Sequence, residues 1–296
     1  MLNVNSAAVQ TAPALAEKRK VNPLRGVAIH GALLISSFAM LYPLLWMLSA
    51  SFKPQDRIFN DNSLIPSPVT LDGYITGWAG ISVGFGTFFM NSAIVSGLSI
   101  MGNLLSCSLA AFAFARLEFV GRKVMFGAVL LTMMLPAHVT LIPQYVLFFD
   151  LGWLNTFLPL VVPKFLAVDA FFIFLMVQFF RGIPHEIQEA AQMDGCNPFQ
   201  IYIYIIMPLS VPVLATAAIF TFIYTWDDFF GPLVYLSDIN KYTIAVGLRT
   251  FVDGTGVSNW GAVFAMSCLA IVPVLLLFVF FQRFLIEGIA TSGLKR

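Results

Sequence analysis

Long apolar stretches separated by short polar segments make up most of the sequence after residue 25. An α-helix rises about 1.5 Å per residue, so about 20 apolar residues cross the roughly 30 Å hydrocarbon core of a bilayer. Six stretches are long enough, at residues 27–51, 88–115, 124–149, 154–180, 209–236 and 262–284. We therefore expect an all-α membrane protein with six transmembrane helices. The end of the fifth helix is ambiguous because Asp227 and Asp228 lie within it.

The two ends of the chain differ from this pattern. Residues 1–20 are polar and lack apolar periodicity, so they are predicted to be disordered. Basic residues precede the first apolar stretch, as in a signal peptide, but the stretch is too long for the apolar region of such a peptide. The predicted domains are the tail, residues 1–25, and a transmembrane domain, residues 26–296. This domain includes a polar loop, residues 182–208, and a C-terminal tail, residues 285–296.

Composition supports a membrane protein and excludes several other classes. Hydrophobic residues make up 59% of the chain and charged residues only 10%, whereas soluble proteins carry about 25% charged residues. The net charge of +1 gives no reason to expect nucleic-acid binding. The three cysteines include no C-x-x-C pair, so neither a metal site nor a disulfide framework is expected.

The distribution of lysine and arginine predicts the orientation, because cytoplasmic loops retain an excess of these residues. With a cytoplasmic N-terminus, eleven of them lie in the cytoplasm: Lys18, Arg19, Lys20, Arg25, Arg116, Arg122, Lys123, Arg181, Arg283, Lys295 and Arg296. Four lie on the other side: Lys53, Arg57, Lys241 and Arg249. We therefore expect both termini in the cytoplasm, with Lys164 within or near the membrane.

The polar loop between the fourth and fifth stretches has the signals of two short helices. Pro184 suits the first position of a helix, and Glu186 in the first turn complements the positive end of its dipole. Gly195 suits a left-handed C-terminal stop. This predicts a helix over residues 184–194, followed by a second helix that Asn197 caps and Pro198 begins.

The first of these helices has the composition of a docking surface. Ile187, Ala190 and Ala191 share one face, with Glu186 and Glu189 beside it. The alternative is an amphipathic helix resting on lipid headgroups, which favours lysine and arginine on its polar face. This helix has neither, so contact with a protein partner is favoured.

Ionisable residues in the apolar stretches are candidate functional residues because the bilayer makes them costly. Lys164 is placed near the outer face, where its ammonium group can reach the headgroups or line a path and bind an anionic sugar. Trp226 with Asp227 has the chemistry of a sugar site, but also that of a membrane boundary or a structural hydrogen bond. Both alternatives stay open for each site, with the boundary or structural hydrogen bond favoured for Trp226 and Asp227.

The polar loop resembles the EAA loop of bacterial ABC-importer permeases. That motif reads Glu-Ala-Ala, three residues, Gly, nine residues, Ile, one residue, Leu-Pro, and here it is Glu189-Ala190-Ala191, Gly195, Ile205 and Met207-Pro208. The single departure is methionine for leucine at position 207, a change that conserves volume and apolarity.

The rest of the chain resembles the smaller six-span permease of the maltose-type carbohydrate-uptake importers. The resemblance extends from Tyr42 and includes Ala111-Phe-Ala-Phe-Ala-Arg116, Leu151-Gly-Trp-Leu-Asn-Thr156, Trp226-Asp-Asp-Phe229 and the segment from Glu287 to Lys295. It implies a type I permease bundle in the bacterial inner membrane, with a sugar or oligosaccharide as substrate and no catalytic residues.

The resemblance also implies partners. These are a second permease subunit, a dimer of cytoplasmic ATPases and an extracytoplasmic solute-binding protein. The ATPase would dock on the loop, and its closure would use the docked helix as a lever that turns the bundle from inward-facing to outward-facing. The docking residues would be Glu186, Glu189, Ala190, Ala191, Asp194, Gly195 and Pro208. A C-terminal contact to the ATPase would involve Gly293, Leu294 and Lys295.

Two other classes of protein compete with this interpretation. A proton-coupled secondary sugar transporter usually has more spans and two halves with paired broken helices. An intramembrane enzyme needs a catalytic constellation, and neither H-E-x-x-H nor G-x-S-x-G occurs in an apolar stretch. The chain also lacks a G-x-x-x-x-G-K-[ST] phosphate loop, so ATP and magnesium are expected on a partner and no cofactor on this chain. Maltodextrin-like, uronate and glycerol-phosphate substrates all stay open.

Overall fold

A computed structural model describes residues 23–80, 82–252 and 258–293. Every regular element in these ranges is helical. The chain forms two units, Met1–Trp46 and Met47–Arg296. The first contains most of α1 (Pro23–Ala50), in which Val27–Ala50 is apolar and long enough to cross a membrane. The first predicted span is therefore confirmed, and the residues of the predicted tail before Pro23 lie outside the described ranges.

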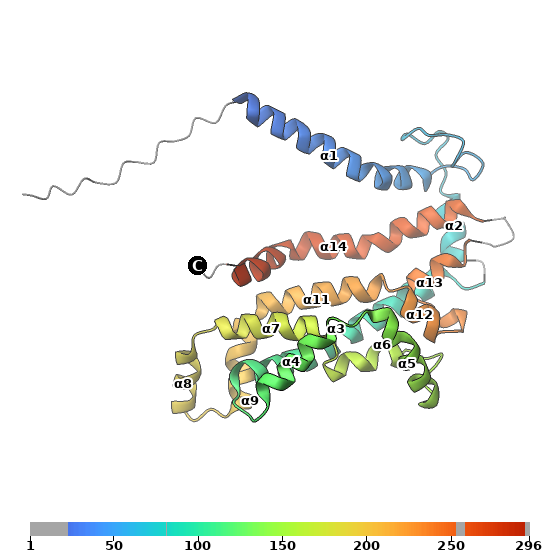
Figure 1. Cartoon of the computed structure of the whole chain (residues 1–296). Helices are drawn as coiled ribbons and strands as arrows, with labels where there is room; N and C mark the ends of the chain where they lie inside the picture. The colour runs from blue at the N-terminus through green and yellow to red at the C-terminus, as the bar shows by residue number, and fades with distance from the viewer. Residues whose placement is uncertain (1–22, 81, 253–257, 294–296) are drawn as a thin grey trace, which may run out of the picture. The chain divides into compact units, whose positions relative to one another are not determined.

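The second unit is built around four helices that lie side by side: α3, α7, α11 and α14. In Figure 1, α8 and α9 lie at one end of this group, and α2, α12 and α13 lie at the other end. The helices of this unit are α2 (Asp72–Ala79), α3 (Phe85–Arg116), α4 (Arg122–Thr132), α5 (Ala137–Asp150), α6 (Leu158–Val161), α7 (Ala170–Gly182), α8 (His185–Met193), α9 (Pro198–Ile201), α10 (Met207–Leu209), α11 (Val211–Trp226), α12 (Phe230–Tyr235), α13 (Ile244–Arg249) and α14 (Trp260–Gly293). Three further elements are the 3₁₀ helices η1 (Val162–Leu166) and η3 (Ile239–Lys241) and the π-helix η2 (Tyr202–Ile206).

Two hydrophobic clusters hold the second unit together. The first cluster joins α3, α7 and α11 to the polar loop, through Ala111, Phe180, Ala191 and Ile206 among others. The second cluster joins α3, α11, α13 and α14, with Phe85, Phe88, Trp226 and Met266 at its centre. One side of the polar loop is therefore packed against the body of the protein, while most of its residues stay exposed.

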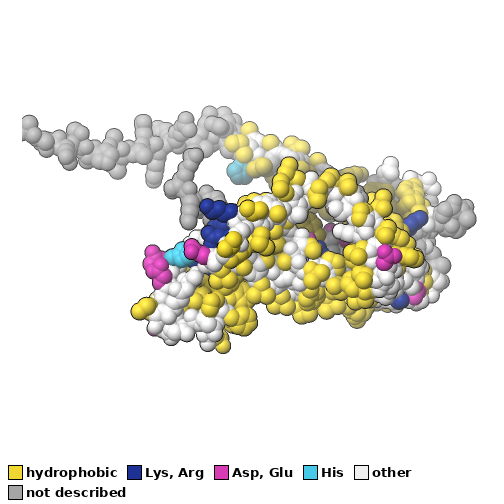
Figure 2. All heavy atoms as spheres, turned by 60° about the horizontal axis from the view of Figure 1, so that its bottom comes forward, with side chains coloured by type: hydrophobic (Ala, Val, Ile, Leu, Met, Phe, Trp, Pro, Cys, Tyr) yellow, Lys and Arg dark blue, Asp and Glu magenta, His cyan; other side chains and the backbone are white. Residues whose placement is uncertain are grey.

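The surface agrees with a membrane environment. On the face shown in Figure 2, hydrophobic side chains cover most of the length of the helices, and charged side chains gather toward its two ends. Many large apolar side chains are exposed, among them Leu131, Ile142, Val146 and Phe280. Apolar surface of this extent is typical of contact with lipid or with another membrane subunit.

The spans are less continuous than the apolar pattern predicts. Four helices of the described chain are long and apolar enough to cross a membrane, and a bent pair, Pro198–Leu209 with Val211–Trp226, makes a fifth. The single helix expected over residues 124–149 is two helices, α4 and α5, because extended Pro136 precedes α5. A proline lacks the N–H that a continuous helix needs, so the chain breaks there.

The fourth and fifth predicted spans are also interrupted. Ala167 has a left-handed backbone, with φ of 54°, which separates η1 from α7. The bent pair turns by 78° between Leu209 and Val211. The short helix α10, which contains Pro208, joins this bend to the π-helical η2. Prolines and π-turns are the usual causes of sharp bends in helices.

The last long helix extends into the predicted tail at the end of the chain. Residues 285–293 of the predicted C-terminal tail belong to α14, which ends at Gly293. Leu294 and Lys295, two of the predicted tail residues, lie outside the described residues.

Candidate functional site

Helix α8 of the polar loop has well-defined ends. The predicted helix is present, shortened by one residue at each end, because extended Pro184 caps it instead of beginning it and Asp194 is the C-cap. Gly195 has φ of 85°, and the next N–H, that of Cys196, donates to the carbonyl oxygen of Ala191 at 2.9 Å. This is the left-handed stop that Gly195 predicts, since glycine takes positive φ without steric cost.

The turn leads directly into a second capped helix. The Asn197 side chain accepts a hydrogen bond from the Gln200 N–H, and the Gln200 side chain accepts one from the Asn197 N–H, each at 2.9 Å. Pro198 occupies the first turn. This reciprocal capping box confirms the predicted start at Asn197 and fixes the direction in which the chain leaves α8.

The two faces of α8 differ from the expected arrangement. Gln188 and Ala191 are the buried residues of α8, and Ala191 packs into the first cluster. Ile187 and Ala190 are exposed, whereas Ala191 is buried. The expectation that these three residues share one face is therefore wrong for Ala191. The exposed side chains of α8 include Glu186, Ile187, Glu189, Ala190 and Met193. This exposed surface combines carboxylates with apolar groups and carries no lysine or arginine.

Arg116 joins the end of α3 to the start of the polar loop. Its side chain is buried, and Nη2 donates to the carbonyl oxygens of Phe180 and Ile183. Those carbonyls belong to the last turn and the C-cap of α7, where helical carbonyls lack partners within the helix. From the sequence, Arg116 was one of the positive charges that set the orientation and the end of a segment that resembles the permease family, and this contact was not predicted.

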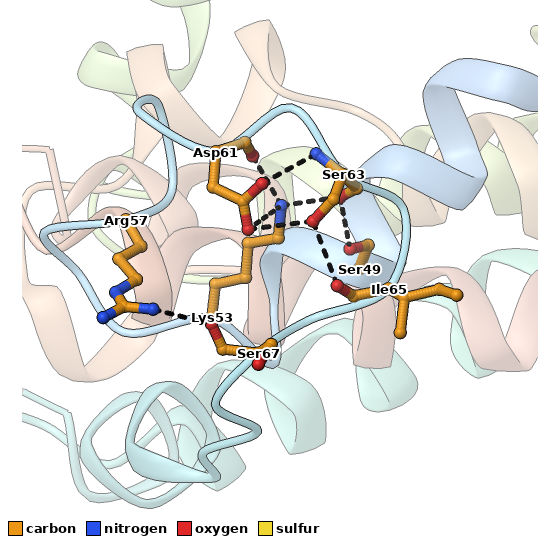
Figure 3. A network of polar contacts seen from close by, with 7 residues as sticks. All are labelled: Ser49, Lys53, Arg57, Asp61, Ser63, Ile65 and Ser67. Carbon is orange, nitrogen blue, oxygen red and sulfur yellow. Dashed lines mark hydrogen bonds and ion pairs between the residues drawn. The ribbon is translucent and has the colours of Figure 1, made fainter.

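A second polar network holds the loop between α1 and α2, residues 51–71. The Lys53 ammonium group is buried and donates to the carbonyl oxygens of Asp61, at 2.6 Å, and Ser63, at 2.7 Å. Its Nζ also lies 3.5 Å from the Asp61 carboxylate. Figure 3 shows these contacts, together with Arg57, which donates to the carbonyl oxygen of Ser67 at 2.9 Å. The lysine therefore closes this loop from within.

Asp61 is held in its ionised form by the same network. The N–H and hydroxyl group of Ser63 donate to its two carboxylate oxygens, at 2.9 and 2.8 Å. These hydrogen bonds, with a smaller contribution from Lys53, lower the pKa of Asp61 below its ordinary value. The carboxylate is thus a stable partner for the buried ammonium at neutral pH.

The structure gives Lys164 a partner that the sequence did not suggest. Its Nζ lies 2.8 Å from Oδ2 of Asp169, and the two side chains are 27% and 24% exposed. The hydroxyl group of Ser106 donates to the carbonyl oxygen of Lys164 at 2.7 Å. Ala167, which lies between Lys164 and Asp169 in the chain, has a left-handed backbone, and this turn brings the Lys164 and Asp169 side chains together. The pair therefore lies at the break in the fourth span.

Trp226 and Asp227 are not equally accessible. The Trp226 ring is buried, stacks on Phe222 and meets the edge of Phe89, and its Nε1 donates to the carbonyl oxygen of Ala270 at 2.9 Å. A structural hydrogen bond of Trp226 is one of the alternatives left open by the sequence. The indole ring that makes this bond lies in the packed core. Asp227 is exposed at the C-cap of α11.

Comparison with known proteins identifies the class of the chain. Residues 102–290 match the protein family described as binding-protein-dependent transport system inner membrane component. The chain belongs to this family. The permease is 34% identical to the probable ABC transporter permease protein YurM of Bacillus subtilis, over 87% of this chain and 84% of that protein. It is also 34% identical to the arabinooligosaccharides transport system permease protein AraQ of Halalkalibacterium halodurans, over 94% and 99% of the two chains.

The fold of the permease also has a close counterpart among solved structures. A chain in the crystal structure of a bacterial ABC transporter that imports the acidic polysaccharide alginate superposes with a TM-score of 0.80, covering 91% of this chain and 99% of that one at 24% identity. This likeness supports the fold. The family and its relatives make the chain a multi-pass inner-membrane permease subunit of a binding-protein-dependent ABC importer, which is a transport component and not an enzyme.

Proposed function

We propose that this permease pairs with a second permease subunit to form the path of a sugar or oligosaccharide across the inner membrane. A solute-binding protein would deliver the sugar, and a dimer of cytoplasmic ATPases, with ATP and magnesium, would drive the cycle. The similarity to the arabinooligosaccharide permease supports an oligosaccharide substrate. The observation that carries the energy coupling is the exposed surface of α8, a helix whose other side packs through Gln188 and Ala191.

In this proposal α8 is the coupling helix. Glu186 and Glu189 would accept hydrogen bonds from basic groups of the ATPase. Because the Ala190 side chain is small, the surface of the ATPase could come close to α8 there. The Asp194–Gly195 turn and the capping box hold α8 at a fixed angle to the chain that follows. Pro208 lies at the 78° bend between that chain and α11, so a movement of α8 would act on the fifth span.

The topology of the proposal keeps six membrane crossings. The third would combine α4 with α5, and the fifth would include α11, the longer arm of the bent pair. Non-helical backbone is tolerated at membrane depth where it is buried in protein or lines a cavity. Both termini would lie in the cytoplasm, on the side of α8, and Gly293, Leu294 and Lys295 would approach the ATPase dimer from the end of α14.

Lys164, Trp226 and Asp227 are the candidate residues of the substrate path, and Lys164 is favoured among them. Its partly exposed ammonium group lies at a break in a span, and broken helices commonly line transport sites. Maltodextrin-like, uronate and glycerol-phosphate solutes remain candidates for the substrate. A cation in the path would favour the acidic ones.

Replacing Lys164 with Met tests this role. If Lys164 binds an acidic oligosaccharide, Lys164→Met should lower its uptake into proteoliposomes at least about tenfold, equivalent to about 1.4 kcal/mol. Asp169→Asn, which keeps the cation, should retain uptake. The double variant Lys164→Met/Asp169→Asn leaves no unpaired carboxylate and should be as impaired as the single lysine variant. Unchanged uptake in Lys164→Met, or recovery in the double variant, would show that Lys164 does not contact the substrate.

The proposal as a whole is tested by purifying the tagged permease from its native membrane. We expect an ATPase and a second permease to co-purify, and the reconstituted complex to import sugar only with ATP inside the liposomes and binding protein outside. Sugar entry without ATP, by the permease alone and driven by a proton gradient, would instead indicate a secondary transporter.

A further inference from the structure

The guanidinium group of Arg116 is only partly used by the contacts described above. The residue is 5% exposed, and Nη2 makes both of its hydrogen bonds, the one to Ile183 at 2.5 Å. Nε and Nη1 are buried and have no acceptor among the described residues. Since a guanidinium carries five N–H groups, three of them are buried and unpaired. An unpaired buried donor is costly, which favours a conformation in which it finds an acceptor.

A complementary unpaired acceptor lies in α8. Gln188 is 8% exposed, and its Oε1 is buried without a donor in the described part of the chain. It lies one helical turn before Ala191, which packs into the first cluster together with Phe180 and Ile183. Side chains of a helix lean toward its N-terminus, so the Gln188 side chain leans toward the N-terminal end of α8, which is the end close to Ile183.

Residues next to Arg116 in the chain and residues near Gln188 pack against the same hydrophobic cluster from different elements. Ala115 and Leu117, the neighbours of Arg116 in the chain, pack against the first cluster from α3 and its C-cap. Ile183, which Arg116 already contacts, is separated from α8 by Pro184 alone. A displacement of α8 toward α3 would let Gln188 Oε1 accept a hydrogen bond from the unused side of the guanidinium group.

We infer that Arg116 is a positioning residue of energy coupling, and that it donates to Gln188 Oε1 when the ATPase moves α8. The inference rests on the proposed function of α8. In both states Nη2 holds the carbonyls at the end of α7. In the displaced state Nε or Nη1 also holds α8, so that α3, α7 and α8 move together. Without that hydrogen bond, the short segment before Pro184 would absorb the movement and α3 would not follow.

A double-mutant cycle on the purified complex tests this pair. Arg116→Met and Gln188→Met keep apolar volume and remove the proposed hydrogen bond between the two side chains. Arg122→Met is the matched control. Arg122 lies in α4, and its Nη1 donates to the carbonyl oxygen of Leu117 at 2.8 Å. With Mg·ATP as the probe, ATP turnover is measured per assembled complex. We expect each variant of the pair to lower kcat about tenfold without changing KM for ATP, and the double variant to be no slower than the slower single variant. Arg122→Met should behave as the wild type.

A conservative variant separates positioning from folding. In Arg116→Lys the ammonium group can still serve the carbonyls of Phe180 and Ile183, but it lacks the planar fork that reaches a third acceptor. Assembly should therefore be normal while kcat stays low. Wild-type turnover in Gln188→Met or Arg116→Lys, or multiplication of the two effects in the double variant, would overturn the inference. If the wild-type complex contains no ATPase, the proposed function itself fails, and this result is distinct from the others.

Discussion

Replacing Gly195 with valine should abolish the stimulation of ATPase activity by the binding protein, with the complex still assembled. Gly195 has φ of 85° at the end of α8, and an added Cβ would have no atom within 4 Å. The penalty is therefore conformational, about 1–2 kcal/mol for an L-residue in the left-handed region and more for a β-branched one. We expect α8 to lose its stop and its angle to the chain that follows.

Asparagine and aspartate at the same position separate backbone strain from charge. Asparagine tolerates the left-handed region, so Gly195→Asn should keep most of the stimulation. Gly195→Asp has nearly the same shape but adds a carboxylate beside Asp194 on the exposed surface of α8, and we expect it to lose stimulation at least about tenfold more than Asn. The measurement is ATPase activity of the reconstituted complex with and without sugar-loaded binding protein, normalised to the co-purified ATPase. Full stimulation in Gly195→Val would show that the left-handed turn is not needed for coupling.

Replacing Gly73 with alanine should destabilise the permease more than the same change at Gly77 or Gly127. Gly73 lies where α2 packs against α14, and an added Cβ would be 2.6 Å from the carbonyl oxygen of Gly261 and 2.8 Å from its carbonyl carbon. Both are backbone atoms, so one helix must move away from the other. Forced repacking of this kind costs about 1–3 kcal/mol.

Two further glycines provide graded controls for this prediction. At Gly77 the Cβ would approach the Met266 side chain, at 2.8 Å, and a methionine can adapt its rotamer. At Gly127, in α4, nothing lies within 4 Å, so alanine should gain up to about 1 kcal/mol of helix propensity. The apparent unfolding midpoint in detergent should therefore fall in the order Gly127→Ala, Gly77→Ala, Gly73→Ala. Equal midpoints for the first and last variants would mean that α2 and α14 can separate without cost.

The local signals of the polar loop were sufficient to predict its structure. The ends of α8 follow from Pro184 and Gly195, and the capping box from Asn197, because each depends on residues a few positions apart. The direction of α8 was harder to predict. Ala191 is buried because the first cluster supplies Phe180 and Ile206, residues from other elements that periodicity within nine residues cannot include.

The breaks in the spans show where an apolar pattern is insufficient. Pro136 lies in the break between α4 and α5 and is the N-cap of α5, whereas Pro143 lies inside α5. The same residue type gives both outcomes, because the surrounding packing decides whether a freed carbonyl finds a partner. The pair of Lys164 and Asp169 depends on a left-handed alanine, for which the sequence has no signal. By contrast, Gly73 and Gly77 form a G-x-x-x-G pattern that could have indicated the close contact of α2 with α14.

The way Lys53 closes its loop has a consequence for how this protein can diverge. Both of its short hydrogen bonds go to main-chain oxygens, those of Asp61 and Ser63, which every amino acid supplies. The shape of the loop therefore depends on a few side chains, those of Lys53, Arg57 and Asp61 among them, and tolerates many others along its exposed length, such as Ile65 and Val69. Mutations that adapt this surface to a new protein partner can accumulate there while the backbone beneath stays the same.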